Sequence, residues 1–382
     1  MACRQPRRNF AGKDSLIAKL LRMTCKITRL LCTLQQIRNS SLFRLPALGR
    51  ISLLAPLLVM AAACSPQEPT VTLGVYSGRH YNTDKQLYKQ FTDQTGIGIN
   101  LLEAKDKVLL QRLEAEGSNS PADVLVLADA ARLVKASGMG LYQATSSSQL
   151  EADVPSNLRD PQGHWYALTR RARVPIVNPE IVDPATIKSY DDLANPALKG
   201  KLCLRNRKSP YNQSLVADQM ILRGKEATAQ WIRGMTSNVS QEFFSSDTPQ
   251  IQAVGTGTCG VALVNTYYVG RMLGGQKGEA NKTLAEKVTV VFPDPTHVNI
   301  SGAGVTAASK HPKKALQLIE FLASPAAGKG YAQANYEYPV KGLGDNAVLE
   351  TFGAFTPDDV SVEQLGAMNQ QAQELMEANG WK

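Results

Sequence analysis

The sequence predicts an α/β protein of two lobes, joined by two extended hinge strands, with a ligand-binding cleft between the lobes. The 382 residues are enough for two domains behind a leader segment. Strand-like and helix-like segments alternate along the chain, a pattern typical of a mainly parallel sheet covered by helices. Two extended segments, at about 166–178 and 298–307, bracket the second part of this alternation. We interpret them as hinge strands that allow a cleft to close on a ligand.

The first lobe begins with a β-branched run, 71–76, which is closed by the turn residues Ser77 and Gly78. A helix is predicted at 83–94, because Leu87 and Phe91 are four residues apart and Gly96 follows. The same reasoning predicts helices at 106–116 and 129–138 and a buried strand at 122–127.

The second lobe repeats this alternation. Its predicted strands are 201–205, 260–265 and 288–292, and its predicted helix is 215–234. A strongly amphipathic helix at 313–322 follows the second hinge strand. The predicted organisation is a leader at 1–64, a first lobe at 65–170, a second lobe at 171–300, and a return to the first lobe at 301–382, with the last helices packing on the second lobe.

The excess of positive charge belongs to the leader. Residues 1–63 contain eleven Lys and Arg residues and a single acidic residue, Asp14, which leaves 31 basic and 32 acidic residues out of 42 and 33 in the whole chain. A nearly neutral body gives no support to nucleic-acid binding. The apolar run 51–63 is too short to span a membrane and is typical of a signal peptide.

Cysteines are interpreted by their position. The small residues before Cys64 resemble a bacterial lipoprotein signal, in which this cysteine carries the lipid anchor; the alternative is ordinary cleavage near Ala63. Cys203 and Cys259 remain for the folded body. Two cysteines in an exported protein are expected to form a disulfide, with a metal-binding pair as the alternative.

No motif of a known enzyme class supports a catalytic function. The sequence contains no GxSxG, P-loop or HExxH motif, and no GxGxxG motif that opens a helix. Its four histidines are not spaced as metal-binding pairs. We therefore predict a binding protein and not an enzyme.

Four tyrosines follow predicted strands, where open α/β sheets bind ligands. They are Tyr81 after the first strand, Tyr211 after strand 201–205, and Tyr267 and Tyr268 after strand 260–265. A phenolate oxygen is a hard, anionic ligand that suits a small and highly charged cation such as Fe³⁺. Because a phenol has an ordinary pKa of about 10, only a strongly Lewis-acidic ion displaces its proton near neutral pH. Packing, or stacking on a sugar, is the alternative role of such tyrosines.

At these residues the chain resembles the periplasmic ferric-ion binding proteins, and in particular their FutA branch. The likeness extends from Val71 to about Val340 and implies the type II periplasmic-binding-protein fold. It is carried by the segments Tyr76-Ser-Gly-Arg-His-Tyr-Asn-Thr-Asp84, Tyr211-Asn-Gln-Ser-Leu215, Val264-Asn-Thr-Tyr-Tyr-Val-Gly-Arg271 and Asn335-Tyr-Glu-Tyr-Pro-Val340.

The resemblance implies a set of iron ligands. Tyr81, Tyr211, Tyr267 and Tyr268 would be the binding phenolates, and His80 matches a histidine ligand of many relatives. Other members add a carboxylate from the loop after the second strand, but here that place holds Ala128 with Asp129 beside it. The resemblance also implies a periplasmic or otherwise extracytoplasmic monomer whose partners are an inner-membrane ABC permease and its ATPase.

Charge suggests two further residues of the site. Four phenolates and one Fe³⁺ sum to one negative charge, which favours a nearby cation. Arg271 follows Tyr268 by three residues, and Arg171 lies on the first hinge strand. The principal alternative function is a protein of the same fold that binds an organic or oxyanion ligand. An enzyme with this fold is disfavoured by the absence of catalytic motifs. A DNA-binding regulator with this fold is disfavoured by the export leader, which stands where a helix-turn-helix would be needed.

Overall fold

The computed structural model describes residues 71–79 and 81–382, which fall within one compact unit, Gln67–Lys382. The predicted leader, the predicted lipid site Cys64 and the candidate ligand His80 lie outside the described residues.

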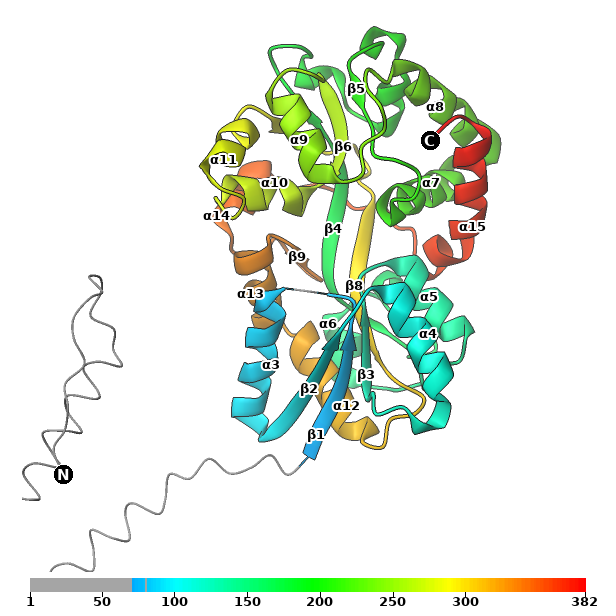
Figure 1. Cartoon of the computed structure of the whole chain (residues 1–382), viewed down its shortest axis with the longest axis vertical. Helices are drawn as coiled ribbons and strands as arrows, with labels where there is room; N and C mark the ends of the chain where they lie inside the picture. The colour runs from blue at the N-terminus through cyan, green and yellow to red at the C-terminus, as the bar shows by residue number, and fades with distance from the viewer. Residues whose placement is uncertain (1–70, 80) are drawn as a thin grey trace, which may run out of the picture. The chain divides into compact units, whose positions relative to one another are not determined.

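The strands follow one another in the order β2-β1-β3-β8-β4-β6-β5 (Figure 1). β1 (Val71–Ser77) lies between β2 (Ile97–Glu103) and β3 (Val124–Leu127) and is parallel to both. β8 (Val298–Val305) runs antiparallel to β3 on one side and to β4 (Tyr166–Val177) on the other. The two predicted extended segments are thus confirmed as neighbouring strands.

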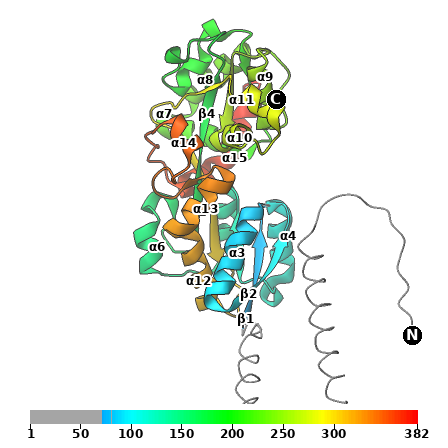
Figure 2. The ribbon, with the colours of Figure 1, turned by 90° about the vertical axis from the view of Figure 1, so that its left-hand side faces the viewer.

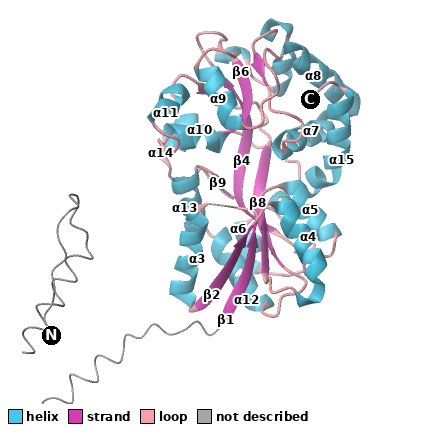
Figure 3. Cartoon of the chain, in the orientation of Figure 1, coloured by secondary structure: helices cyan, strands magenta, loops and turns pink. Residues whose placement is uncertain are grey.

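β4 connects two groups of strands. Up to Ala172 it pairs with β8, and from Arg173 onward it pairs with β6 (Val261–Asn265). β5 (Leu202–Cys203) is parallel to β6, while β7 (Thr289–Val290) and β9 (Tyr338–Pro339) also pair with β4. Figure 3 shows β4 and β8 running from the group of β1 to β3 toward β6. The predicted lobe boundary at 170/171 lies near this change of partner, and the lobe boundaries stay predictions.

The helices around the first group of strands begin and end close to the predicted residues. Gly96, in the left-handed conformation with φ of 71°, ends the first of them, as the sequence indicates. These helices are α3 (Asn82–Thr95), α4 (Asp106–Glu116), α5 (Ala130–Gly138) and α12 (Pro312–Ala323). A further helix, α6 (Ser148–Asp153), was not predicted.

The predicted helix 215–234 is wrong as a single element. Gly224, with φ of 83° and ψ of 165°, separates α7 (Pro210–Arg223) from α8 (Lys225–Asn238). Strands 201–205 and 288–292 are also shorter than predicted, since β5 and β7 contain two residues each. The other helices of this group are α9 (Asp247–Gly255), α10 (Thr266–Leu273) and α11 (Glu279–Ala285), of which the sequence analysis predicted none.

The C-terminal helix contacts both groups of elements. α15 (Val362–Ala378) packs against α5 and against α7, as Figure 1 also shows. α13 (Pro325–Asn335) and α14 (Ala347–Phe352) precede it, and Figure 2 shows all three near the level where the two groups meet. C-terminal helices were predicted here without bounds, and β2 was not predicted.

The central strands are buried on both faces. Every residue of β3, β6 and β8 is buried, as expected for strands covered by helices. Within the part of the chain that the structure describes, no helix combines the length and the apolar character needed to cross a membrane.

Candidate metal-binding site

Each candidate tyrosine stands at the start of a helix. Tyr81 is the N-cap residue of α3, Tyr211 is the second residue of α7, and Tyr267 and Tyr268 are the second and third residues of α10. The helix after Tyr211 was predicted to start at residue 215, and none was predicted after strand 260–265. In the structure α7 starts at Pro210, and α10 follows β6 without a loop. Helix starts carry unpaired N–H groups and a partial positive charge, which favour an anionic ligand or side chain.

Three of the tyrosines are in direct contact. The Tyr267 hydroxyl donates a hydrogen bond to the Tyr211 hydroxyl, with 3.3 Å between the oxygens. The rings of Tyr267 and Tyr268 stack with their centroids 4.4 Å apart and an angle of 29° between the planes. Tyr267 is buried, whereas Tyr211 and Tyr268 are partly exposed. The structure thus brings these three residues together, as the sequence predicts.

Tyr81 faces this cluster from a different element. The guanidinium carbon of Arg271, on α10, lies 5.2 Å from the centroid of the Tyr81 ring, and that of Arg79 lies 5.0 Å from it. Burial raises the pKa of Tyr81, and the charges of Glu337, Tyr211 and Tyr268 raise it further, against the opposing effect of Arg79. The start of α3 and the start of α10 are therefore neighbours in the structure.

Burial favours the protonated form of Tyr211 and Tyr267 in the metal-free protein. Burial raises the pKa of Tyr267 well above its ordinary value. Burial also raises the pKa of Tyr211, although the positive charge of Arg171 offsets part of this effect. A ligand cation must therefore displace these protons, and only a highly charged ion does so near neutral pH.

Arginines surround the tyrosines. The guanidinium carbons of Arg171 and Arg205 lie 5.3 and 5.5 Å from the centroid of the Tyr211 ring. With Arg79 and Arg271 on Tyr81, four arginines contact the cluster, including both that the sequence analysis selected. It missed Arg79 and Arg205. Arg79 could have been found because it directly precedes His80 and Tyr81, and Arg205 because it ends the predicted strand 201–205.

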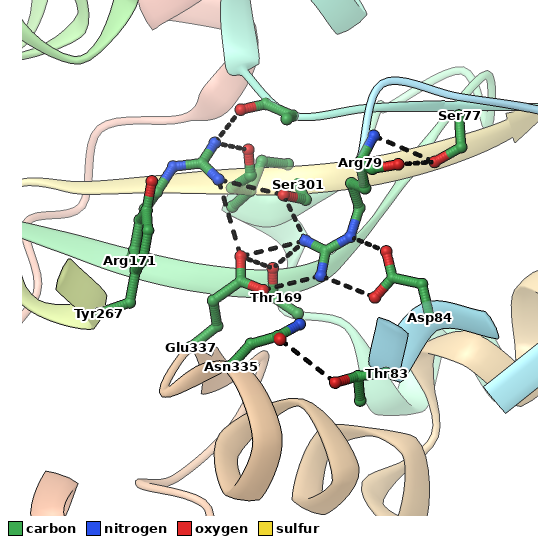
Figure 4. Close-up of polar contacts among 12 residues, drawn as sticks. Ser77, Arg79, Thr83, Asp84, Thr169, Arg171, Tyr267, Ser301, Asn335 and Glu337 are labelled. Atoms are coloured by element: carbon green, nitrogen blue, oxygen red, sulfur yellow. Dashed lines mark hydrogen bonds and ion pairs between the residues drawn. The ribbon is translucent and has the colours of Figure 1, made fainter. Parts of the chain in front are cut away.

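A buried polar network fixes two of these arginines (Figure 4). Arg79 forms ion pairs with Asp84 and Glu337, each at 2.7 Å, and donates to the Ser301 hydroxyl at 2.8 Å. Arg171 donates to the same hydroxyl at 3.1 Å and lies 3.9 Å from Glu337. Burial raises the pKa of Glu337, but the charge of Arg79 and its hydrogen bond outweigh burial, so the pKa falls below its ordinary value.

This network has no net charge, because two guanidinium groups face two carboxylates. Arg171 also donates to the carbonyl oxygens of Ala128 and Ile300, so its side chain is held from β8 and from the loop after β3. Its cationic group is thereby kept against the Tyr211 ring. Glu337 was not a candidate of the sequence analysis, although it lies within the segment 335–340.

Asp129 has a structural role. Its carboxylate caps α5 by accepting from the Ala131 N–H at 3.1 Å, and it accepts from the Asn299 amide at 3.0 Å. The side chain is buried. Each of its two oxygens thus accepts a hydrogen bond from the protein.

A disulfide lies beside the tyrosine-bearing elements. Cys203 on β5 is bonded to Cys259, and their Cα atoms are 5.9 Å apart. Cys259 comes two residues before β6, the strand that leads into Tyr267. The bond therefore ties β5 to the start of β6.

Comparison with known proteins places this geometry in context. Residues 119–353 match the family model described as bacterial extracellular solute-binding protein. The chain is 44% identical over 315 residues to Iron uptake protein A1 of Synechocystis, which covers 81% of this chain and 87% of that protein.

Solved structures show the same similarity. The Trichodesmium FutA (IdiA) structure in complex with iron and citrate has 39% sequence identity and a TM-score of 0.78, covering 81% of this chain and all of that one. The ferric binding protein of Campylobacter jejuni has 33% identity and a TM-score of 0.75, again covering 81% of this chain and all of that one. The type II periplasmic-binding-protein fold expected from the sequence is confirmed.

Proposed function

Because the chain belongs to the bacterial extracellular solute-binding proteins, we propose that it captures ferric iron outside the cytoplasm and delivers it to an ABC transporter. Two relatives, 44% and 38% identical to this chain, are named for iron uptake, and their likeness extends over 81% of the chain. The protein is a carrier of Fe³⁺ in this account, and iron is its cargo.

One observation carries the assignment of the ligands. The hydroxyl oxygens of Tyr211 and Tyr267, which belong to different helices, lie 3.3 Å apart with Tyr268 stacked beside them. This separation allows one ion to bond both oxygens after their protons leave. We propose that Tyr211, Tyr267, Tyr268 and Tyr81 bind the ion, with His80 as a further ligand.

The orientation of the rings favours a metal over an organic ligand. A site that stacks on a sugar or a heterocycle offers open ring faces. Here guanidinium groups cover the faces of Tyr81 and Tyr211, while Tyr267 and Tyr268 stack on each other. The oxygen atoms are then the groups left for a ligand.

Electrostatics supports the binding of several phenolates at one ion. Four phenolates and one Fe³⁺ leave one negative charge, and Arg271 and Arg171 contact the rings of Tyr81 and Tyr211. The starts of α7 and α10 add partial positive charge at Tyr211, Tyr267 and Tyr268. The positive charge of Arg171 and of the helix starts lowers the cost of deprotonating the buried phenols, against the effect of burial.

Delivery requires a permease and its ATPase as partners, since the family supplies substrate to ABC transporters. We propose that the mature protein is a monomer. Its N-terminus is either a lipid-anchored Cys64 or the product of ordinary cleavage near Ala63. Mass measurement of the mature N-terminal peptide separates these two forms.

Competition with a chelator tests the function. Iron-free mature protein is dialysed with ferric citrate, and the metal retained per chain is measured. We expect one Fe³⁺ per chain, and no comparable retention of Mg²⁺, which prefers other oxygen ligands. Iron that stays with citrate would contradict the proposed function.

A further inference from the structure

A second group of titratable side chains lies away from the tyrosines. It consists of Asp218 on α7, His297 immediately before β8, and Asp358 in the segment before α15. One ligand atom of each lies within 4.8 Å of those of the other two. The side chains are 1–2% exposed, so water does not compensate their charges. Such a group in a protein interior requires a partner.

Each member has one polar atom bonded and one without a partner. The imidazole Nε2 of His297 is 3.0 Å from the Ser214 hydroxyl. The Gln219 amide donates to Asp218 Oδ2 at 2.8 Å, and the Val360 N–H donates to Asp358 Oδ1 at 3.0 Å. The remaining atoms, Asp218 Oδ1, His297 Nδ1 and Asp358 Oδ2, have no hydrogen-bond partner within the described part of the chain.

These three unpartnered atoms face one another. His297 Nδ1 lies 3.6 Å from Asp218 Oδ1 and 3.5 Å from Asp358 Oδ2. Both separations exceed those of an ordinary hydrogen bond. Two ligands bonded tetrahedrally to one ion at about 2.1 Å are roughly 3.4 Å apart, which is close to both values.

From this convergence we propose that Asp218, His297 and Asp358 bind a structural divalent cation of the zinc class, separate from the transported iron. One imidazole and two carboxylates are ligands that Zn²⁺ accepts, with water for a fourth position. The 3.0 Å contact allows the Ser214 hydroxyl to accept from an Nε2–H, and in that tautomer the lone pair of Nδ1 is directed to the ion. Ser214, Gln219 and the Val360 N–H orient the three ligands.

The charge balance of the cluster supports the binding of a divalent ion. Two carboxylates and a divalent cation sum to zero, whereas a protonated His297 leaves one buried negative charge. Burial lowers the pKa of His297, but Asp218 and Asp358 raise it more strongly, to about 9. Two more titratable residues contact His297: the Tyr190 hydroxyl accepts from the His297 backbone N–H and donates to the Arg173 carbonyl, and the Arg173 backbone N–H donates to the His297 carbonyl.

The cation would connect α7, the start of β8 and the segment before α15. α7 carries Tyr211 at its start, and β8 lies within the second predicted hinge strand. α15 contacts both α5 and α7. An ion held by Asp218, His297 and Asp358 would fix the start of β8 against α7. This arrangement does not depend on the assignment of Fe³⁺ to the tyrosines.

Metal analysis tests the proposal on protein whose tyrosine site is already filled with Fe³⁺. The mature protein is produced with added Zn²⁺, loaded with iron, dialysed against EDTA and analysed for both metals. We expect about one zinc per chain beside one iron. Because the cluster is buried, a second sample is refolded with Zn²⁺ present and its disulfide intact. Absence of zinc from both samples would overturn the proposal.

Variants locate the zinc. Asp358→Asn and His297→Gln should each abolish its retention, and Ser214→Ala should weaken zinc affinity about 10- to 100-fold. His164→Gln is the matched control, because His164 also pairs with a carboxylate, Asp160, at 2.9 Å, and is outside the cluster. Circular dichroism verifies that each variant is folded. Zinc retained by a folded Asp358→Asn and a folded His297→Gln alike would refute the assignment.

The pH dependence of the melting temperature distinguishes a metal site from a metal-free group in which a charged His297 pairs with Asp218 and Asp358. In metal-free protein the folded pKa of about 9 exceeds the unfolded value of about 6.5, so the stability from charged His297 is complete below pH 6.5 and is lost toward pH 9. Zinc replaces that proton and should therefore raise the melting temperature more at pH 9 than at pH 6.5. A melting temperature that zinc leaves unchanged at both pH values would identify an ion triad without a metal.

Discussion

The Tyr267 hydroxyl lies 3.3 Å from the Tyr211 hydroxyl, although 56 residues separate the two tyrosines in the chain. Each stands in the first turn of a helix, and both helices start at the same end of paired strands β5 and β6. The contact places two hard oxygen atoms where one cation can bond both. The remaining tyrosines, Tyr268 and Tyr81, extend this pair.

Removal of the Tyr81 hydroxyl should weaken iron binding without abolishing it. In Tyr81→Phe the ring still packs against Arg79 and Arg271, but the ligand from the α3 side is lost. We expect a charge-transfer band at a shifted wavelength, an affinity at least about 10-fold lower, and less closure in solution scattering. Tyr142→Phe, a buried tyrosine whose hydroxyl contacts the Leu125 carbonyl, is the control. Unchanged affinity and compaction in Tyr81→Phe would show that Tyr81 only packs.

Arg171 should support deprotonation of Tyr211. Its charge lowers the pKa of Tyr211 against the effect of burial. Arg171→Gln removes that charge, so we expect iron affinity to fall about 10-fold or more at pH 7 and to recover partly at higher pH. Arg170→Gln is the matched control on the same strand, because Arg170 donates to the carbonyls of Pro339 and Gly342 instead. Equal effects of the two substitutions would argue against this role.

Iron binding should release protons. The pKa values of Tyr81, Tyr211 and Tyr267 are raised, so these phenols carry their protons in the free protein at pH 7. Lower pH favours the protonated, iron-free form, and affinity should fall by about tenfold per pH unit for each proton displaced. An indicator dye in weakly buffered solution counts the protons released per iron. Release of no protons by the protein would exclude phenolate ligands.

Reduction of the disulfide should destabilise the part of the chain that carries Tyr211 and Tyr267. Cys203 and Cys259 are 56 residues apart in sequence, and closing such a loop contributes about 4 kcal/mol by restricting the unfolded chain. We expect the Cys203→Ser/Cys259→Ser variant to unfold at lower denaturant concentration than the wild type. Mass spectrometry of exported protein should find no free thiol at either position, and two free thiols would refute the pairing in the cell.

The tyrosine cluster was predictable because it follows from local rules. Strands 71–76 and 260–265 are visible as apolar runs, and candidate tyrosines follow each of them in the sequence. The start of α10 was hidden, since this short helix follows β6 directly and contains two aromatic residues and Gly270. Local propensity does not favour a helix there, and tertiary packing decides.

The polar network could not be predicted from local sequence. Arg79 and Glu337 are 258 residues apart and meet only after the chain returns through β8 and α13. The same holds for His297, which the sequence presents as an isolated histidine and which the fold places between Asp218 and Asp358. Strand pairing and helix packing bring these partners together. The periodic pattern of a sequence predicts single strands and helices, but it does not show which of them become neighbours.

A visible titration of iron-free protein with Fe³⁺ tests the central claim most directly. Phenolate bound to Fe³⁺ gives a charge-transfer band, so the wild type should become coloured and saturate at one iron per chain. Tyr267→Phe, which removes one oxygen of the pair that is 3.3 Å apart, should lose most of this capture. A wild-type protein that stays colourless while iron remains with a competing chelator would contradict the account.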